Sequence, residues 1–292
     1  MKSFKQFRQY LSEARDTSAG KQWHKDHPVD YMNIVNHHDQ ATKVEHRAGR
    51  NWYRDAQNFA QTVSRSTKMP VHAIAGLTSV YSPQTAWHDN MIVAARVARH
   101  GKTVGGKEQK PYYRYGKSFA DNQQRKAAER IINGEHYENV IKGFKTKAFA
   151  RLIEHGGDKD PNNPEVVVDR HAHSVASGAR ITDAAFSVSG LKGKKKYDSV
   201  KKAYIQAADH INARTGAKIG DKHYLHPHQL QAITWLVRQR LNNEQDIASG
   251  KKDSKAVVKA AKSREKAQQK WRNYSGTWHP GVSHLFEDED NE

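Results

Sequence analysis

Apolar residues recur at helical spacing through most of this chain, and that period limits the folds open to it. One clear example runs from Trp52 to Val63, where apolar side chains return every three or four residues on one face. Only the three valines at 166–168 indicate a strand. A β-rich fold needs many more alternating segments than that. The sequence therefore predicts a mainly α fold.

Start and stop residues divide this pattern into separate helices. Pro70 suits the first turn of one helix, and Ser118 is a candidate N-cap for another that runs to Ile132. A long amphipathic helix is expected over residues 197–213, and a further helix is expected to open at Pro227.

Charge and cysteine content restrict the class of protein. The chain has 292 residues, a formal net charge of +18 and no cysteine. A positive excess of this size favours a polyanionic partner, most commonly nucleic acid, so we expect DNA as the partner. Without cysteine, the chain forms no disulfide, thiol nucleophile or cysteine-ligated metal cluster. No apolar run has the length of a membrane span. We therefore expect a DNA-binding protein without membrane attachment, cofactor or bound metal.

Residues 1–13 lack the continuous apolar core of a secretory signal. One helical face carries the large apolar side chains of this stretch, which are Phe4, Phe7, Tyr10 and Leu11. The plain interpretation is a frayed terminal helix. The stretch also resembles the capsid-targeting leader of internal head proteins of large tailed phages. That resemblance implies a phage prohead protease as partner, cleavage after Glu13, and location in the virion head or the host cytoplasm.

Composition and pattern together divide the chain into four parts. These are a leader over residues 1–13, a flexible connection over 14–45, a helical domain over 46–242 and a charged helical tail over 243–292.

The stretch EVVVDRHAHSVASG at residues 165–178 places Asp169 at the start of a helix. An Asp in that position ordinarily caps the helix by accepting backbone N–H bonds. A carboxylate that is held rigidly and stays ionised can also stabilise a cationic sugar transition state or position a nucleophile. Both interpretations use the same geometry, and the sequence leaves them open.

Upstream, YENVIKGFKTKAFARLI predicts a short helix, a tight turn at Lys142-Gly143 and a second helix that ends at Gly156-Gly157. Such a turn can direct backbone N–H groups at a DNA phosphate. With VDRHAHSV and LTSVYSPQTAWHDN, it resembles the helix-hairpin-helix DNA glycosylase superfamily, the endonuclease III-like enzymes, over roughly residues 50–240. The resemblance implies a glycosylase-like helical domain, with Asp169 as the catalytic carboxylate acting on a flipped base.

The same resemblance assigns roles to other residues. In bifunctional family members a hairpin lysine attacks the sugar, and the register leaves Lys145 and Lys147 as candidates. Lys142, Gly143 and Arg170 are expected to contact the DNA backbone. The residues expected to hold the base are Ser82, Gln84, Trp87, Asn90, His171 and Gln231.

The chain departs from the family pattern in three places. Its hairpin has one glycine, Gly143, and no proline; DKDPNN lengthens the interval between lysine and aspartate; and the iron–sulfur cysteines are missing.

Two other functions fit parts of the pattern. Segments from GRNWYRDAQNFA to QLQAITW resemble uncharacterised phage proteins distantly akin to these glycosylases. Some phage relatives of that fold are thought to transfer an amine, such as an amino acid, onto an activated thymine methylene, which makes a base-hypermodification transferase the enzymatic alternative. The charge alone also fits a non-catalytic internal head protein that binds packaged DNA. Trp87 is equally compatible with a place in the core.

The chain is rich in histidine, with 18 residues. One metal-binding alternative combines Asp169, His171, His173, His223, His226 and His228. It ranks lower because residues two apart on a helix, such as His171 and His173, point in different directions.

Overall fold

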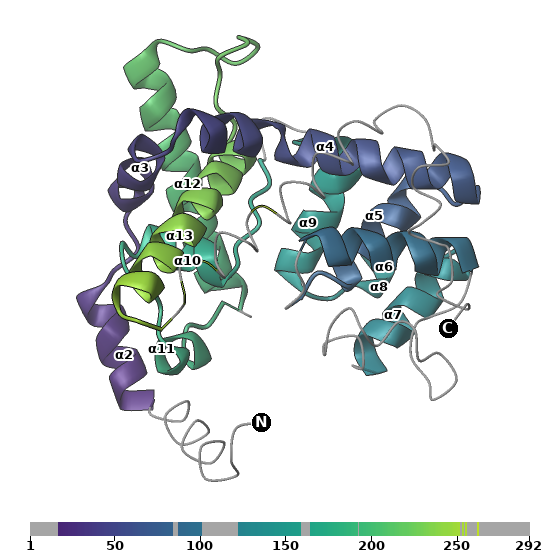
Figure 1. Cartoon of the computed structure of the whole chain (residues 1–292), viewed down its shortest axis with the longest axis horizontal. Coiled ribbons are helices and arrows are strands. Elements are labelled where there is room, and N and C mark those ends of the chain that lie inside the picture. The colour runs from purple at the N-terminus through teal and green to yellow at the C-terminus, as the bar shows by residue number, and fades with distance from the viewer. Residues whose placement is uncertain are drawn as a thin grey trace. The chain divides into compact units, whose positions relative to one another are not determined.

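The structure is a computed structural model of the chain (Figure 1). It describes residues 17–83, 87–100, 122–158, 164–191 and 193–251, together with residues 253, 255 and 262. The expected leader at 1–13 and most of the expected tail beyond 251 lie outside the described residues. So does Gln84.

The described residues form helices and no strand, so the mainly α prediction is confirmed. The helices are α2 (Thr17–Asp26), α3 (Tyr31–Asp39), α4 (Lys43–Thr67), α5 (Val71–Val80), α6 (Trp87–His100), α7 (Asn122–Ile132), α8 (Tyr137–Val140), α9 (Phe144–His155), α10 (Arg170–Ala176), α11 (Asp183–Ser187), α12 (Lys194–Thr215) and α13 (Pro227–Ala248). No helix in these ranges is long and apolar enough to cross a membrane.

The chain divides into two compact units, and the boundary between them falls inside α4. Unit 1 comprises residues 1–52 and 160–249, and unit 2 comprises residues 53–159 and 250–292. Each unit has its own hydrophobic core. This division differs from the single helical domain over residues 46–242 that the sequence pattern predicts. The bounds of that domain stay a prediction.

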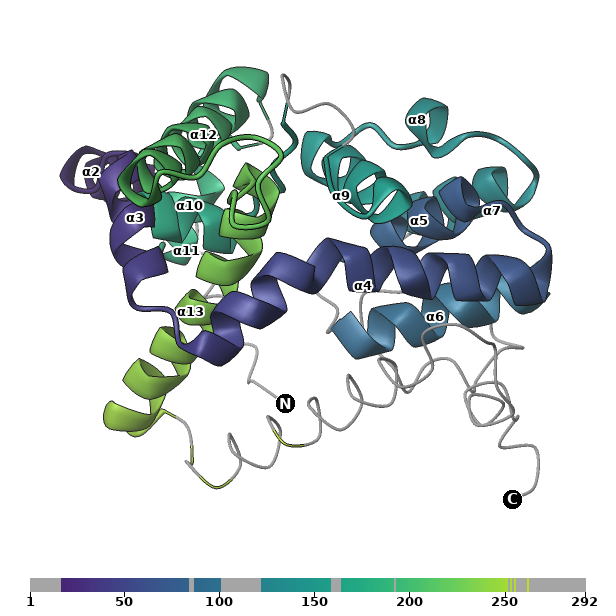
Figure 2. The same cartoon turned by 90° about the horizontal axis from the view of Figure 1, so that it is seen from above.

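Unit 2 is built around α5, which packs against α6, α7 and α9 (Figure 2). Every residue of α5 from Ala73 to Val80 is buried, because VHAIAGLTSV is apolar or small on all sides. Gly76 allows the closest approach, since a Cβ there would lie 2.7 Å from the Cβ of Tyr137. The central helix therefore needs a glycine at that point.

In unit 1, α3, α10, α12 and α13 pack around a second core, and α2 packs against α11 (Figure 1). Small residues on α12 and α10, such as Ala203, Ala207 and Ala172, are fully or nearly buried there. They let the helices approach closely, and Tyr204, Leu230 and Ile233 fill the space between them.

The three valines at 166–168 are buried but form no strand. The reason is a side chain that takes the place of a neighbouring strand. The hydroxyl of Tyr197 donates to the carbonyl of Val166 at 2.7 Å and accepts the N–H of Val168 at 3.4 Å. Buried backbone groups need partners, and here one tyrosine supplies two.

The flexible connection expected over 14–45 is wrong for its described part, which forms α2, α3 and the start of α4. Ile34 and Val35 are buried in the core of unit 1. Asp30 caps α3 by accepting the N–H of Met32 at 2.9 Å. The polar, histidine-rich composition hid these helices because few large apolar residues mark their buried faces.

Candidate active site

Asp169 is the N-cap of α10 and is half-buried. Its backbone is extended, and its Oδ1 accepts the N–H of Ala172 at 2.8 Å. Its other oxygen, Oδ2, has no hydrogen-bond partner among the described residues, and the carboxylate forms no ion pair with them. The side chain is therefore fixed through one oxygen, as that of Asp30 is at the start of α3.

Two buried tyrosines of α12 lie close enough to Asp169 to sense its charge. Burial raises the pKa of both Tyr197 and Tyr204, and the negative charge of Asp169 raises each further. The hydroxyl of Tyr204 shares a hydrogen bond of 3.2 Å with Thr234 of α13. These hydroxyl groups are thus neutral and committed to the packing around α10, where they support the backbone that carries the carboxylate.

Arg170, expected to contact the DNA backbone, is engaged within unit 1. Its guanidinium forms an ion pair with Asp183 at 2.7 Å, donates to the carbonyl of Ile181 at 2.9 Å and lies 5.3 Å over the ring of Phe186. The side chain ties α10 to α11. A phosphate would have to compete with Asp183 for it.

His171 and His173 face different elements, as their spacing predicts. The ring of His171 lies 6.3 Å from that of Trp235 on α13. His173 is fully buried and stacks on His24 of α2 at 5.2 Å. Gln231, the other base-holding candidate in this unit, is buried on α13. The two histidines therefore do not assemble into one metal site.

In unit 2, α8 and α9 form the two helices on either side of the Lys142-Gly143 turn, as predicted. Ile141 is buried and anchors the turn, while Lys142, Gly143 and Phe144 are exposed. Gly143 is the N-cap of α9 and supplies no side-chain cap. The N–H groups of the first turn of α9 therefore have no side-chain acceptor from the cap, which is the arrangement that binds anions at helix starts.

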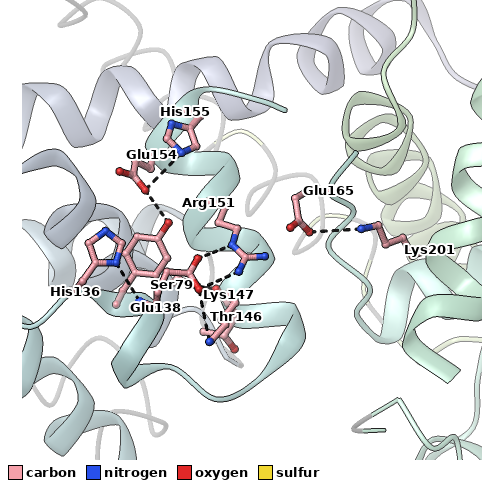
Figure 3. Close-up of polar contacts among 11 residues, drawn as sticks. Ser79, His136, Glu138, Thr146, Lys147, Arg151, Glu154, His155, Glu165 and Lys201 are labelled. Atoms are coloured by element: carbon pink, nitrogen blue, oxygen red, sulfur yellow. Dashed lines mark hydrogen bonds and ion pairs between the residues drawn. The ribbon is translucent and has the colours of Figure 1, made fainter. Parts of the chain in front are cut away.

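The structure separates the two candidate lysines. Lys147 lies 3.5 Å from Glu138, which also receives two hydrogen bonds from Arg151, at 2.5 and 2.9 Å (Figure 3). Lys145 is half-buried and forms no hydrogen bond or ion pair among the described residues. Lys142 donates only to the carbonyl of Asn139, at 3.1 Å. Lys142 and Lys145 are thus the hairpin cations not neutralised by a carboxylate.

The upstream base-holding candidates lie at the junction of α5 and α6. Ser82 donates its hydroxyl proton to the carbonyl of Ser79 at 2.9 Å. Trp87 packs against the core of unit 2, with its ring 6.0 Å from Phe149. Asn90 is 1% exposed, and its Oδ1 has no hydrogen-bond partner in the described part of the chain. Trp87 and Asn90 thus pack in the core of unit 2. For Trp87, a place in the core is one of the two alternatives that the sequence leaves open.

The chain matches the family described as a family of unknown function, DUF7178, over residues 21–244. The chain belongs to this family. The match spans parts of both units, including α8, α9, α10 and α13. No curated protein and no solved structure matches the chain.

Within unit 2, one group of side chains in this DUF7178 protein has ligand atoms close enough for a metal. Atoms of His72, His136 and Glu154 lie within 4.8 Å of one another in unit 2. Tyr137 orients the carboxylate by donating to Glu154 Oε2 at 2.7 Å (Figure 3). However, His136 Nδ1 accepts the N–H of Glu138 at 3.3 Å, which puts the proton of the neutral ring on Nε2. A metal at Nε2 would have to displace that proton, so the group fits a proton-sharing cluster better than a metal centre.

The sequence does not reveal the side chains that hold the backbone before Asp169. The helix expected over residues 197–213 includes Tyr197 and Tyr204, but nothing in its pattern indicates which groups their hydroxyls bind. Arg50 of α4 makes another contact of unit 1 that the sequence does not indicate, because its guanidinium donates to the carbonyls of Lys222, His223 and Tyr224 at 3.2, 3.3 and 2.7 Å. Long-range contacts of this kind leave no local signal in a sequence.

Proposed function

We propose that this protein is a DNA-binding enzyme of glycosylase-like fold that acts on a flipped base, with Asp169 as its catalytic carboxylate. The observation that carries the proposal is the state of Asp169. The cap fixes the carboxylate in one orientation, and a fixed negative group is what the proposed chemistry requires. Here Oδ1 is bound at 2.8 Å, and Oδ2 has no partner in the described ranges of this strongly basic chain.

In this proposal, the chemistry of Asp169 is electrostatic. Cleavage of a glycosidic bond builds positive charge on the sugar, and a fixed carboxylate stabilises that charge without reorganising. The cap holds the side chain in one orientation, which reduces the entropy lost when the transition state forms. The same carboxylate could orient a nucleophile instead, so its geometry fits both excision and group transfer.

The helix–turn–helix arrangement of α8 and α9 supports a role in holding the DNA backbone. Its exposed turn combines an uncapped helix start with Lys142 and Lys145, neither of which is paired with a carboxylate in the described structure. Backbone N–H groups and lysines are the usual phosphate ligands of such hairpins. The net charge of +18 adds a general attraction for a polyanion. This is the basis for proposing the helix-hairpin-helix relationship and, with the leader pattern, a phage origin.

Binding and chemistry are tested separately. Affinity for a duplex oligonucleotide is measured over a range of salt concentrations for the wild type, Lys142→Ala and Lys145→Ala. We expect each substitution to weaken binding and to reduce the salt slope by about one unit, because each lysine releases a counterion on contact with phosphate. Lys147→Ala is the matched control, and a smaller loss is expected because Lys147 already lies 3.5 Å from the Glu138 carboxylate.

Chemistry is followed by incubating the protein with duplexes that carry a panel of damaged and modified bases, then digesting the DNA to nucleosides for mass spectrometry. Free base with abasic sites indicates excision, whereas a heavier nucleoside indicates a transferase. Asp169→Asn should abolish either product and leave salt-dependent affinity unchanged. Tight DNA binding with no product on any substrate would replace this proposal with the non-catalytic, DNA-packaging role.

A further inference from the structure

Arg238 of α13 is a buried cation for which the described residues supply no partner. Its exposed fraction is 7%, and its Nε is fully buried with no hydrogen bond. The described residues offer this guanidinium no hydrogen bond and no ion pair. All the groups that bear on it belong to unit 1.

Neighbouring charges do not compensate Arg238. Burial lowers the pKa of Arg238, and the positive charge of Arg180 lowers it further. Asp246, the buried carboxylate on the same helix, is taken by Arg180, whose Nη1 lies 2.6 Å from its Oδ1. Arg180, Arg238 and Asp246 together therefore carry one excess positive charge.

A charge in this state is costly for the free protein. Burying an ion with no counter-ion costs several kcal/mol, and a guanidinium remains protonated at any ordinary pH. Other arginines of the unit avoid that cost, because Arg214 pairs with Asp39 and Arg240 pairs with Glu45. Arg238 is thus a cation whose counter-ion is not supplied by the described residues.

Other polar atoms near Arg238 are also unsatisfied. His37 of α3 lies within electrostatic range, since burial lowers its pKa and the charge of Arg238 lowers it further. His37 Nδ1 donates to the carbonyl of Asn33 at 2.8 Å, so its buried Nε2 is left as an acceptor with no donor. Asn242, one turn after Arg238 on α13, has a buried Oδ1 with no partner. The described residues therefore offer Arg238 no anion, and they offer His37 Nε2 and Asn242 Oδ1 no donor.

We propose that Arg238, together with Arg180 and His37, forms a binding site for a phosphate group. A phosphate supplies anionic oxygens for the guanidinium in bidentate geometry. A monoprotonated phosphate also carries a P–O–H group that can donate to His37 Nε2. The site is independent of the proposed chemistry at Asp169 and of the hairpin. Its phosphate can come from a free small molecule or from a nucleic acid, whose terminal monoester can carry that P–O–H group and whose internal phosphodiesters can engage the guanidinium alone.

The first test is direct binding of inorganic phosphate to the full chain, at constant ionic strength with chloride as the replaced anion. We expect the melting temperature to rise with phosphate concentration, as binding to the folded state requires. We also expect the ³¹P resonance of phosphate to broaden when the wild-type protein is added. This broadening is measured on the wild-type protein, so it does not depend on whether a variant folds. No shift in melting temperature and no broadening would overturn the proposal.

The second test uses Arg238→Met, which keeps the length of the side chain and removes its charge. In phosphate-free buffer this variant should melt at or above the temperature of the wild type, because an uncompensated charge has been replaced by an apolar group. Its affinity for phosphate should fall about tenfold or more, because the charge-assisted bonds are lost. Arg214→Met is the control: it removes an exposed arginine that is paired with Asp39 and should keep the full phosphate response. An Arg238→Met variant that melts well below the wild type in phosphate-free buffer, yet responds fully to phosphate, would contradict the site.

The source of the phosphate is separated by comparing a nucleoside monophosphate with a duplex oligonucleotide. Loss of monophosphate binding with unchanged DNA affinity in Arg238→Met identifies a small-molecule site. A weaker DNA affinity with a salt slope lower by about one unit identifies a nucleic-acid phosphate. Asp169→Asn should retain the phosphate response in either case, so failure of the proposed catalysis and failure of this site are distinguishable.

Discussion

The hydroxyl group of Tyr197 donates to the carbonyl of Val166 at 2.7 Å, across 31 residues of sequence. It also accepts the N–H of Val168 at 3.4 Å. One side chain of α12 therefore holds the extended segment that leads directly into Asp169.

Tyr197→Phe should destabilise unit 1 by about 1–3 kcal/mol, because it leaves two buried backbone groups without a partner. Unfolding in urea, followed by circular dichroism, measures the difference. Tyr31→Phe is the control, since the hydroxyl of Tyr31 forms no hydrogen bond in the described structure and its ring contacts His210. Equal stability of Tyr197→Phe and the wild type would show that water satisfies these groups.

The segment at residues 166–168 also shows which features of the structure the sequence could predict. Three consecutive valines indicate burial correctly, but a strand also needs a partner, and no local pattern reveals whether one exists. Helix periods and caps are local, so α5, α9, α12 and α13 were predictable near their observed bounds. Asp169 was identified as a cap for the same reason.

The sequence could not predict which charged side chains form ion pairs. Lys145 and Lys147 are equivalent by spacing, and only the approach of Glu138 separates them. Arg180 binds Asp246 across 66 residues of sequence, while no described residue pairs with Arg238. Contacts of this range follow from the tertiary fold and have no signature in a single sequence.

Gly76→Ala should destabilise unit 2 by about 1–3 kcal/mol, a typical cost of forcing extra volume into a packed core. The added Cβ would lie 2.7 Å from Tyr137 Cβ and 3.2 Å from Ile131 Cδ1, and the first of these atoms is fixed close to the backbone. Thermal unfolding followed by calorimetry measures the loss. Gly143→Ala provides the control, because the atom nearest to its added Cβ would be Thr146 Oγ1 at an ordinary 3.4 Å. If both variants melt alike, α5 has more freedom to shift than its buried surface implies.

Acid should destabilise unit 1 through His173. Burial, together with the positive charges of Lys196 and His24, lowers the pKa of His173 to about 3. Because the folded-state pKa lies below the unfolded value of about 6.5, the neutral ring contributes its full stability above that value and loses it as the pH falls towards 3. The loss from this one group is about 2 kcal/mol at pH 5.

The measurement compares urea unfolding at pH 7.5 and pH 5 for the wild type and His173→Leu. The variant should lose less stability on acidification. Some loss should remain, because burial also lowers the pKa of His37 and His46. His223→Gln, at an exposed position, should behave as the wild type does. An unchanged pH dependence in His173→Leu would assign the acid sensitivity to other histidines.

Asp169 allows the structural and chemical roles of one carboxylate to be separated. Asn caps helices about as well as Asp, so Asp169→Asn should keep the bond to the N–H of Ala172 and change stability by only a few tenths of a kcal/mol. Asp169→Ala removes the cap and should cost about 1 kcal/mol. Any product formed on DNA should nevertheless disappear equally in both variants, because neither has a negative charge to stabilise a cationic sugar. Urea unfolding and nucleoside mass spectrometry on the same preparations provide the two readouts. If activity instead follows stability, with Asp169→Asn fully active and Asp169→Ala impaired, then Asp169 is a helix cap alone and the reacting group lies elsewhere.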